Sequence, residues 1–289
     1  INNIVGSDGR LPENGVVSPI IGNDGIMPPI VSNPGTPDII ENRLNIYFED
    51  KNADLNKWVQ DFKQIYPSDS YQVIGYDPNV RMIQIQIPEG QRDNIREELP
   101  LKISDQKFFI VDESIMVLHG NKSQSTGNKG WHLKATHVKE GWDITKGDPN
   151  LVVAIIDDGI DVNHSMFKDR FFKAYNVFTQ NRALSPGQGH GTHVAGLAVG
   201  STEFYSEGAA GVAPNCKIMP VQVFDNGMCT FSSLASGIMY AIHNGANIVN
   251  ISIGPSFQGL SQLPIEEQIK VAQQYFKNEE KVYKHIINT

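Results

Sequence analysis

The 289-residue chain contains only two cysteines, Cys216 and Cys229. Two cysteines in a chain of this length do not make a disulfide framework or a CxxC metal pattern, so we expect two free thiols. No apolar run approaches the roughly 20 residues that a helix needs to cross a bilayer, so no membrane-spanning segment is predicted. Acidic residues outnumber basic ones by 32 to 24, and this net charge of −8 does not favour nucleic acid or an anionic membrane as a partner.

Four stretches of different composition follow one another along the chain. Gly, Pro, Asn and Asp dominate residues 1–43, which lack hydrophobic periodicity and predict an extended arm. Residues 44–118 carry strand and helix patterns and predict a first domain. The small, polar residues 119–130 are typical of a linker, and residues 131–289 predict a second domain of a different class.

Residues 44–118 predict a β-α-β-β-α-β order, which is the ferredoxin-like α+β plan. A helix is indicated because one helical face carries Leu55, Trp58, Val59, Phe62 and Ile65. Later in the segment, Ile83, Ile85 and Ile87 alternate with glutamines, as expected of a half-buried strand. The pattern itself says nothing about activity.

Residues 131–289 predict an α/β fold with a parallel sheet. The continuous apolar run Leu151–Ile156 fits a strand that is buried on both faces. Residues 216–224 predict another strand, whose Pro220 favours an edge or irregular position, and residues 246–254 predict a further buried strand. Strands that alternate with helices predict a doubly wound sheet, in which ligands collect at the carboxyl ends of the strands.

Asp157 and His190 form the candidate catalytic pair. A carboxylate directly after a buried strand needs a hydrogen-bond donor, and a histidine between Gly189 and Gly191 can approach another backbone closely. Together they make two-thirds of a nucleophile-activating relay. The carboxylate would hold the imidazole in one tautomer, and the imidazole would take the proton of a hydroxyl group.

The segments VVAIIDDGIDVNH and GHGTHVAG resemble the Asp and His signatures of the subtilisin-like serine proteases, the subtilases. GWDITKG, GVAPNCKIMPVQVF and ANIVNISIGPS match the same family in the same order, so the resemblance covers about residues 128–256. It implies a serine endopeptidase with a partial subtilisin-like parallel sheet flanked by helices, acting on a peptide or protein substrate. It further implies that the preceding domain is a propeptide, which acts in this family as folding chaperone and inhibitor.

Because the chain is uncut after the implied propeptide, we expect a zymogen, an inactive variant or a prosegment that is kept. Residues 116–127 would then cross the active site and contain the self-processing cut. Proteases with such a segment are mostly exported, so a secreted, periplasmic or cell-surface location is expected.

The resemblance also assigns roles to single residues. Asp157 would be the triad acid and His190 the triad base, while His193 and His164 would be structural. Asp158 resembles the second acid of the kexin-like branch, which favours basic substrates, and is therefore a candidate specificity residue.

Two further segments are implied to bind substrate. Ser252, Ile253 and Gly254 resemble one wall of the primary specificity pocket. Gly227, Met228 and Cys229 resemble the edge strand that pairs with the substrate backbone, where main-chain hydrogen bonds supply affinity.

The chain departs from the family pattern in two respects. No Gly-Thr-Ser box and no Ala-Ala-Gly-Asn strand end occur in the 289 residues, so the family's nucleophile and its oxyanion-hole asparagine are missing. We therefore expect this chain alone to be inactive and to need the C-terminal remainder of the catalytic domain, as a continuation or a second chain, to supply the serine. Met166 stands where the family often has an acidic residue of its strong calcium site, so calcium is allowed but no metal or cofactor is assigned.

Other interpretations of the same residues stay open at this point. His190 and His193 could bind a metal together with Asp157, and Asp157 and Asp158 could act as two general acid/base carboxylates, although adjacent strand residues face opposite ways. Ser252 could be a nucleophile. The rival from another functional class is a catalytically inactive subtilase-like module that binds a peptide or a partner chain.

Overall fold

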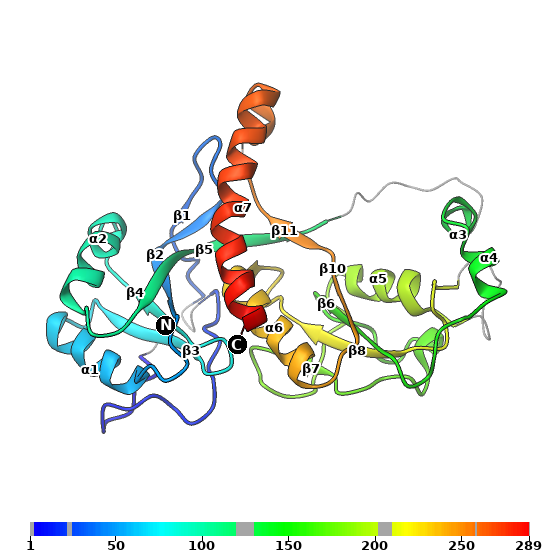
Figure 1. The fold of residues 1–289 in the computed structure, drawn as a ribbon, viewed down its shortest axis with the longest axis horizontal. Coiled ribbons are helices and arrows are strands. Elements are labelled where there is room, and N and C mark those ends of the chain that lie inside the picture. The colour runs from blue at the N-terminus through cyan, green and yellow to red at the C-terminus, as the bar shows by residue number, and fades with distance from the viewer. Residues whose placement is uncertain (1–2, 22–24, 120–129, 202–209, 258, 289) are drawn as a thin grey trace. The chain divides into compact units, whose positions relative to one another are not determined.

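The computed structural model describes residues 3–21, 25–119, 130–201, 210–257 and 259–288 (Figure 1). The chain divides into two compact units, and each contains segments that are distant in sequence. Unit 1 comprises residues 1–116, 228–236 and 255–289, and unit 2 comprises residues 117–227 and 237–254. Among the described residues, no helix has both the length and the apolar composition that a membrane crossing requires.

Unit 1 contains the predicted β-α-β-β-α-β order. The elements are β2 (Ile39–Phe48), α1 (Leu55–Ile65), β3 (Gln72–Asp77), β4 (Met82–Gln86), α2 (Arg92–Lys102) and β5 (Phe108–Leu118), of which the last two residues of β5 belong to unit 2. Antiparallel pairing arranges the strands as β5-β2-β4-β3, and the short β1 (Ile30–Val31) also pairs with β2. The predicted domain boundaries at residues 43, 118 and 130 stay predictions, and residues 120–129 of the predicted linker lie outside the described residues.

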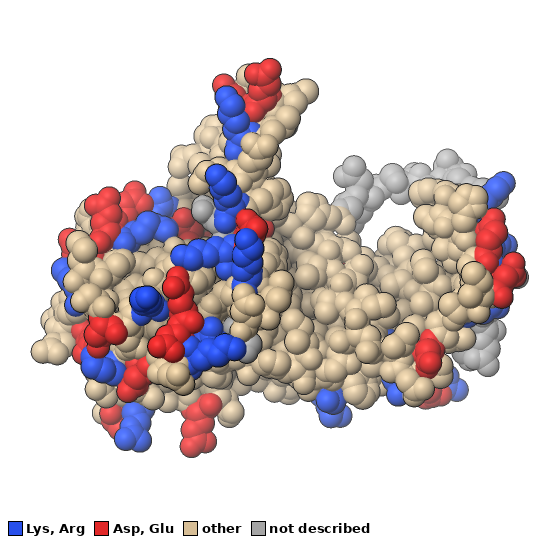
Figure 2. Space-filling view, in the orientation of Figure 1, with Lys and Arg blue, Asp and Glu red and all other residues tan. Residues whose placement is uncertain are grey.

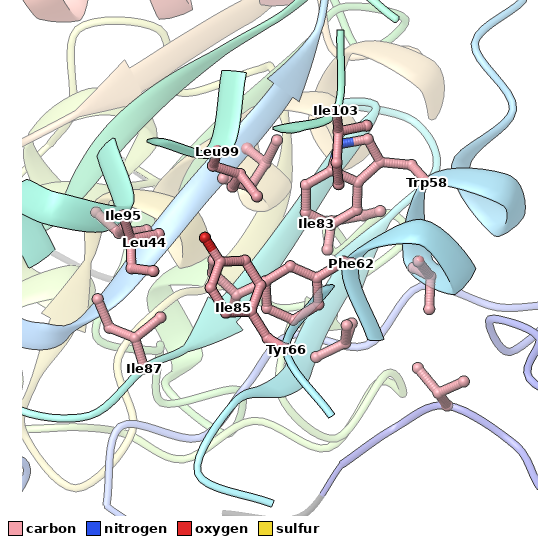
Figure 3. Close-up of a cluster of buried hydrophobic side chains, with 14 of the residues drawn as sticks. Leu44, Trp58, Phe62, Tyr66, Ile83, Ile85, Ile87, Ile95, Leu99 and Ile103 are labelled. Atoms are coloured by element: carbon pink, nitrogen blue, oxygen red, sulfur yellow. The ribbon is translucent and has the colours of Figure 1, made fainter. Parts of the chain in front are cut away.

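One face of this sheet packs against α1 and α2 and forms an apolar core. In the second half of β2, the alternate residues Leu44, Ile46 and Phe48 are fully buried on this face. Figure 3 shows Trp58 and Phe62 of α1 and Leu99 of α2 directed into the same cluster. The helical stripe predicted from the sequence is thus a core stripe, as hydrophobic periodicity would suggest.

The other face of the sheet is buried as well, and it carries several polar side chains. Glu113 of β5 accepts hydrogen bonds from the Asn45 amide and, at 2.6 Å, from the Ser232 hydroxyl. These partners come from β2 and from the first turn of α6 (Phe231–His243). Near the end of α7 (Ile265–Asn288), His285 contacts the Val80 carbonyl oxygen at 2.7 Å. Each of these three contacts gives a buried polar side chain a hydrogen-bond partner, which offsets the cost of removing it from water.

The exposed surface of unit 1 carries both signs of charge. Figure 2 shows lysine and arginine interspersed with aspartate and glutamate over α1, α2 and α7. On this face the charges form no large area of a single sign, in agreement with the composition.

The N-terminal arm is anchored to unit 1 at several points. Ile20 is fully buried, and the buried Arg43 guanidinium donates to the carbonyl oxygens of Pro19 and Ile20 at 3.0 and 2.9 Å. Val16 forms a β-bridge with Tyr76 on the edge strand β3. Unit 1 further contains β9 (Cys229–Thr230) and a 3-10 turn, η3 (Leu260–Gln262).

Unit 2 is built on a parallel sheet in the order β10-β6-β8-β7. Its strands are β6 (Val152–Asp157), β7 (Tyr175–Asn176), β8 (Lys217–Gln222) and β10 (Ile248–Ile251), and its helical elements are α3 (Trp131–Ala135), α4 (Val138–Trp142), η1 (Ser165–Phe167) and α5 (His190–Val199). Helix α5 packs beside β6 (Figure 1), with Ala195 and Val199 in the core. β11 (Ile253–Pro255) begins in unit 2 and ends in unit 1.

Two details of unit 2 bear on the sequence predictions. The backbone pairing between β8 and the segment that leads into β7 has a gap. The Phe171–Ile218 bridge lies before the gap and the Tyr175–Val221 pair after it. Pro220 of β8 lies in the gap and has no N–H to donate. The prediction of a buried strand over residues 246–254 is wrong for β10, since Ile248 is 54% exposed. Within the described chain, β10 has β6 as its single neighbour and is therefore an edge strand.

Candidate active site

β6 carries Asp157 to the carboxyl end of the parallel sheet. All six residues of β6 are buried, and Asp157 is its last residue with 1% exposure. One carboxylate oxygen, Oδ1, accepts the backbone N–H of Asp158 at 2.8 Å. The carboxylate is therefore fixed in orientation before any other side chain is considered.

Glycines allow the turn before α5 to approach this strand end. Gly189 is the N-cap of α5 and has a left-handed φ of 87°, a conformation that favours glycine. A Cβ on Gly191 would lie 2.9 Å from the Cβ of Asp157, closer than carbon atoms pack. The glycine-rich motif therefore brings His190, the first residue of α5, next to Asp157.

The two candidate catalytic side chains are in contact. Nδ1 of His190 lies 2.8 Å from Oδ1 and 3.0 Å from Oδ2 of Asp157. Nε2 of the same ring lies 2.9 Å from the backbone carbonyl oxygen of His119. Because a carboxylate and a carbonyl oxygen both accept hydrogen bonds, this arrangement suits an imidazole that carries a proton on each nitrogen.

The acid–base properties of the pair follow from this geometry. Burial lowers the pKa of His190, but the hydrogen bonds to Asp157 and to the His119 carbonyl outweigh burial and raise it above its ordinary value. Burial raises the pKa of Asp157 to about 6, against the opposing effect of its hydrogen bonds from His190 and the Asp158 backbone. The buried carboxylate therefore favours the protonated form of the imidazole that it contacts.

Asp158 points into the turn that precedes α5. Its Oδ1 accepts the N–H of Gly191 at 2.8 Å and its Oδ2 accepts the N–H of Gln188 at 2.7 Å. The side chain is 4% exposed. It borders a pocket of about 520 Å³ whose lining includes Leu118, Phe178, Gln188, Phe224 and Gly227.

The segment around Ser252 lies beside the end of β5. The Ser252 carbonyl oxygen accepts the N–H of His119 at 2.9 Å. The imidazole of His119 packs directly on Gly254. A Cβ on Gly254 would lie 2.9 Å from Cδ2 of this ring, so there is no room for a side chain. Ile253 is buried, and the Ser252 hydroxyl donates to the Asn250 side chain at 3.1 Å rather than toward His190.

The segment around Cys229 also pairs with β5, within unit 1. β9 runs antiparallel to it, with Cys229 opposite Met116 and Thr230 opposite Ile115. Met228 packs against a small cluster of Ile20, Ile40 and Ile115. Cys229 and Cys216 are both buried, and neither takes part in a disulfide bond.

The other candidate histidines lie elsewhere. His193 is exposed on α5, and His164 precedes the η1 turn, where its Nδ1 accepts the Met166 N–H at 3.4 Å. Within the described ranges, no group of three or more His, Cys, Asp or Glu side chains is arranged to hold a metal ion. Met166 packs in the apolar core of unit 2 and brings no carboxylate to that place.

Sequence reasoning did not single out His119. It fell inside the broad segment 116–127, of which residues 120–127 lie outside the described residues. Its role depends on its backbone carbonyl group, and a backbone group leaves no signal in the residue type. Gln222 was also missed; its side chain accepts the Ser185 N–H at 2.9 Å beside the pocket.

Comparison with known proteins identifies the second half of the chain. The model of the subtilase family matches residues 148–286, which include Asp157 and His190. Residues 148–286 belong to the subtilase family. The thermophilic serine proteinase of Bacillus sp. (strain AK1) is 38% identical over 120 residues, which are 41% of this chain and 30% of that protein. Thermitase of Thermoactinomyces vulgaris is 36% identical over 116 residues, or 40% of this chain and 41% of thermitase.

Solved structures with a subtilisin-like fold cover more of the chain. Fervidolysin from Fervidobacterium pennivorans, a keratinolytic enzyme related to subtilisin, matches 82% of this chain and 38% of its own, with a TM-score of 0.54 and 20% identity. The epidermin leader peptide processing serine protease of Staphylococcus aureus matches 84% of this chain and 59% of its own, with a TM-score of 0.55 and 16% identity. At these identities the likeness shows an α/β subtilisin-like fold. The chain spans less than half the length of the two curated relatives named above.

Proposed function

We propose that this chain carries two members of the catalytic triad of a subtilisin-type serine endopeptidase, the acid Asp157 and the general base His190. The observation that supports this most is the continuous set of contacts from the Asp157 carboxylate through the His190 ring to the His119 carbonyl group. The ring of His190 thus lies between the buried acid and a peptide carbonyl group, which is the arrangement that acyl transfer requires. The family's serine and asparagine boxes do not occur in these 289 residues, so in this proposal a continuation of the chain or a second chain supplies both groups.

In the reaction, the serine oxygen attacks the substrate's carbonyl carbon while its proton passes to Nε2 of His190. The C–N bond breaks as the imidazolium returns this proton to the leaving amine, which leaves a serine ester. Water then attacks the ester with the same base, releases the new carboxylate and restores the serine. Asp157 stays ionised throughout and stabilises the imidazolium, which its hydrogen bond to Nδ1 supports.

Each of the two predicted binding segments would contact the substrate. β5 supports this proposal, because Met116 pairs with Cys229 and the N–H of His119 donates to the Ser252 carbonyl, as an added substrate strand would. In the same proposal, residues 44–118 act as the propeptide and the end of β5 is both inhibitor and first substrate. While the His119 carbonyl occupies Nε2, His190 cannot accept a proton, so the zymogen is held inactive. We place the enzyme outside the cytoplasm, with peptides or proteins as substrates.

The first test is labelling of the complete protein that contains this chain with a fluorophosphonate probe. The wild type and His193→Ala are expected to be labelled, whereas His190→Ala and Asp157→Asn are not. His193 is the matched control because it lies on the same helix but is exposed. This chain alone should remain unlabelled. A complete wild-type protein that takes up no probe would support the inactive binding module instead.

The second test is the position of self-processing. Since the carbonyl group next to His190 is that of His119, the released N-terminal fragment should end at His119. Mass spectrometry of the processed protein measures this end directly. Cleavage elsewhere between residues 116 and 127 would contradict this assignment while leaving the endopeptidase proposal standing.

A further inference from the structure

We propose that Asp158 is a positioning residue for His190, and that its carboxylate fixes the turn that presents the imidazole to Asp157 and to the substrate. This inference rests on the proposed function of the same site. It gives Asp158 a role other than the choice of basic substrates that its sequence context suggested.

The hydrogen bonds of Asp158 bracket His190. Gln188 lies two residues before His190 and Gly191 one residue after it, and their N–H groups donate to the two oxygens of the same carboxylate at 2.7 and 2.8 Å. Asp158 itself directly follows β6, where Asp157 is held. One side chain therefore ties the base-bearing turn to the strand that bears the acid, and a small shift at this point would change the distance between the catalytic groups.

The glycines of the motif support the same role. A Cβ on Gly187 would lie 2.5 Å from Oδ2 of Asp158, and one on Gly191 would lie 3.1 Å from Oδ1. By contrast, a Cβ on Gly189 would meet no atom within 4 Å. The two glycines with no room for a side chain are thus the two that pack against Asp158, which accounts for part of the spacing in GQGHG.

Asp158 also opposes the helix dipole at the site of catalysis. His190 is the first residue of α5, where the positive end of the dipole disfavours the imidazolium that forms during the reaction. The Asp158 carboxylate accepts hydrogen bonds at this helix end and adds a negative charge there. Together with Asp157 it raises the pKa of His190, although burial acts in the opposite direction.

The kinetic test compares Asp158→Asn and Asp158→Ala in the complete protein. Asparagine keeps one oxygen for the Gly191 N–H but loses the charge, whereas alanine loses both bonds. We expect kcat to fall in the order Asp, Asn, Ala, by about 10- to 100-fold for alanine, with KM changed little. The acidic limb of the pH profile should move to lower pH in both variants, because His190 loses a neighbouring negative charge. Asp161→Asn is the control, since the Asp161 carboxylate accepts the Asn163 N–H and leaves the turn untouched.

A second measurement is independent of activity. In this chain itself, NMR titration of the His190 ring should give a lower pKa in both Asp158 variants, and the amides of Gln188 and Gly191 should exchange faster with solvent. A change confined to KM for substrates with basic residues, with the His190 titration and both amides unchanged, would overturn the inference. If the complete wild-type protein takes up no fluorophosphonate, the proposed function fails, while the NMR arm still decides the role of Asp158.

Discussion

Glu113 of unit 1 and Asp157 of unit 2 are both buried carboxylates, and they have different partners. In unit 1, Glu113 is fully buried and bonds the Asn45 amide and the Ser232 hydroxyl, neither of which titrates near neutral pH. In unit 2, Asp157 is 1% exposed and bonds the His190 imidazole, which does titrate there. A buried acid thus becomes a catalytic candidate through its partner rather than through its burial.

The largest effect is expected for the acid whose partner titrates. Asp157→Asn should reduce peptide hydrolysis by the complete protein by about 10⁴-fold, because the amide no longer holds the Nδ1–H tautomer of His190. The thermal unfolding temperature should change far less than the rate. Hydrolysis of a peptide substrate, followed next to a melting curve, checks both. A variant with near wild-type rates would show that Asp157 is a structural acid like Glu113.

The corresponding change in unit 1 should cost stability instead. Glu113→Ala leaves the Asn45 amide and the Ser232 hydroxyl without their acceptor and removes the charge that faces the buried Arg43. We expect a loss of about 3 kcal/mol in the free energy of unfolding. Urea unfolding of the chain measures this loss. Glu113→Gln is the matched control and should lose less, because it keeps one acceptor oxygen.

The next contrast lies within the turn before α5. Gly187 and Gly189 both have positive φ, so each alanine substitution costs about 1 kcal/mol from backbone strain. Gly187→Ala adds a collision with Asp158 that Gly189→Ala does not. Melting temperatures and fluorophosphonate labelling should therefore both be lower for Gly187→Ala. Equal effects of the two substitutions would argue against a close approach at Asp158.

The smallest effect should be the pH dependence of stability, and its sign should differ between the units. Burial lowers the pKa of His285 in unit 1, so its stabilising contribution is present above pH 6.5 and is lost as the pH falls below that value. The pKa of His190 in unit 2 is raised, so its contribution is present below pH 6.5 and is lost as the pH rises. Melting curves of His285→Gln and His190→Gln against wild type, recorded from pH 5 to 9, should show opposite trends. A common trend would contradict the comparison.

Much of the local structure could be predicted from the sequence. The stripe from Leu55 to Ile65 became α1, and the run ending at Asp157 became a fully buried strand, because periodicity and apolar runs are local signals. The Asp157–His190 contact could also be predicted, because a buried carboxylate at a strand end needs a hydrogen-bond donor and a glycine-flanked histidine can approach it closely.

What could not be predicted depends on long-range packing. The exposure of Ile248 could not be predicted, because it depends on which strands flank β10. The role of the His119 carbonyl was missed because any residue could supply that group. Asp158 was interpreted through its neighbours in sequence, whereas its hydrogen bonds go to N–H groups about 30 residues away, which only the fold brings near.

The most direct measurement of the central claim is ¹⁵N–¹H NMR of the His190 ring in this chain near neutral pH. The account predicts a slowly exchanging proton on Nδ1 that disappears in Asp157→Ala and persists in Glu113→Gln. An Nδ1 without a proton, or one whose signal does not respond to the loss of Asp157, would contradict the claim that the buried carboxylate of unit 2 holds a catalytic base.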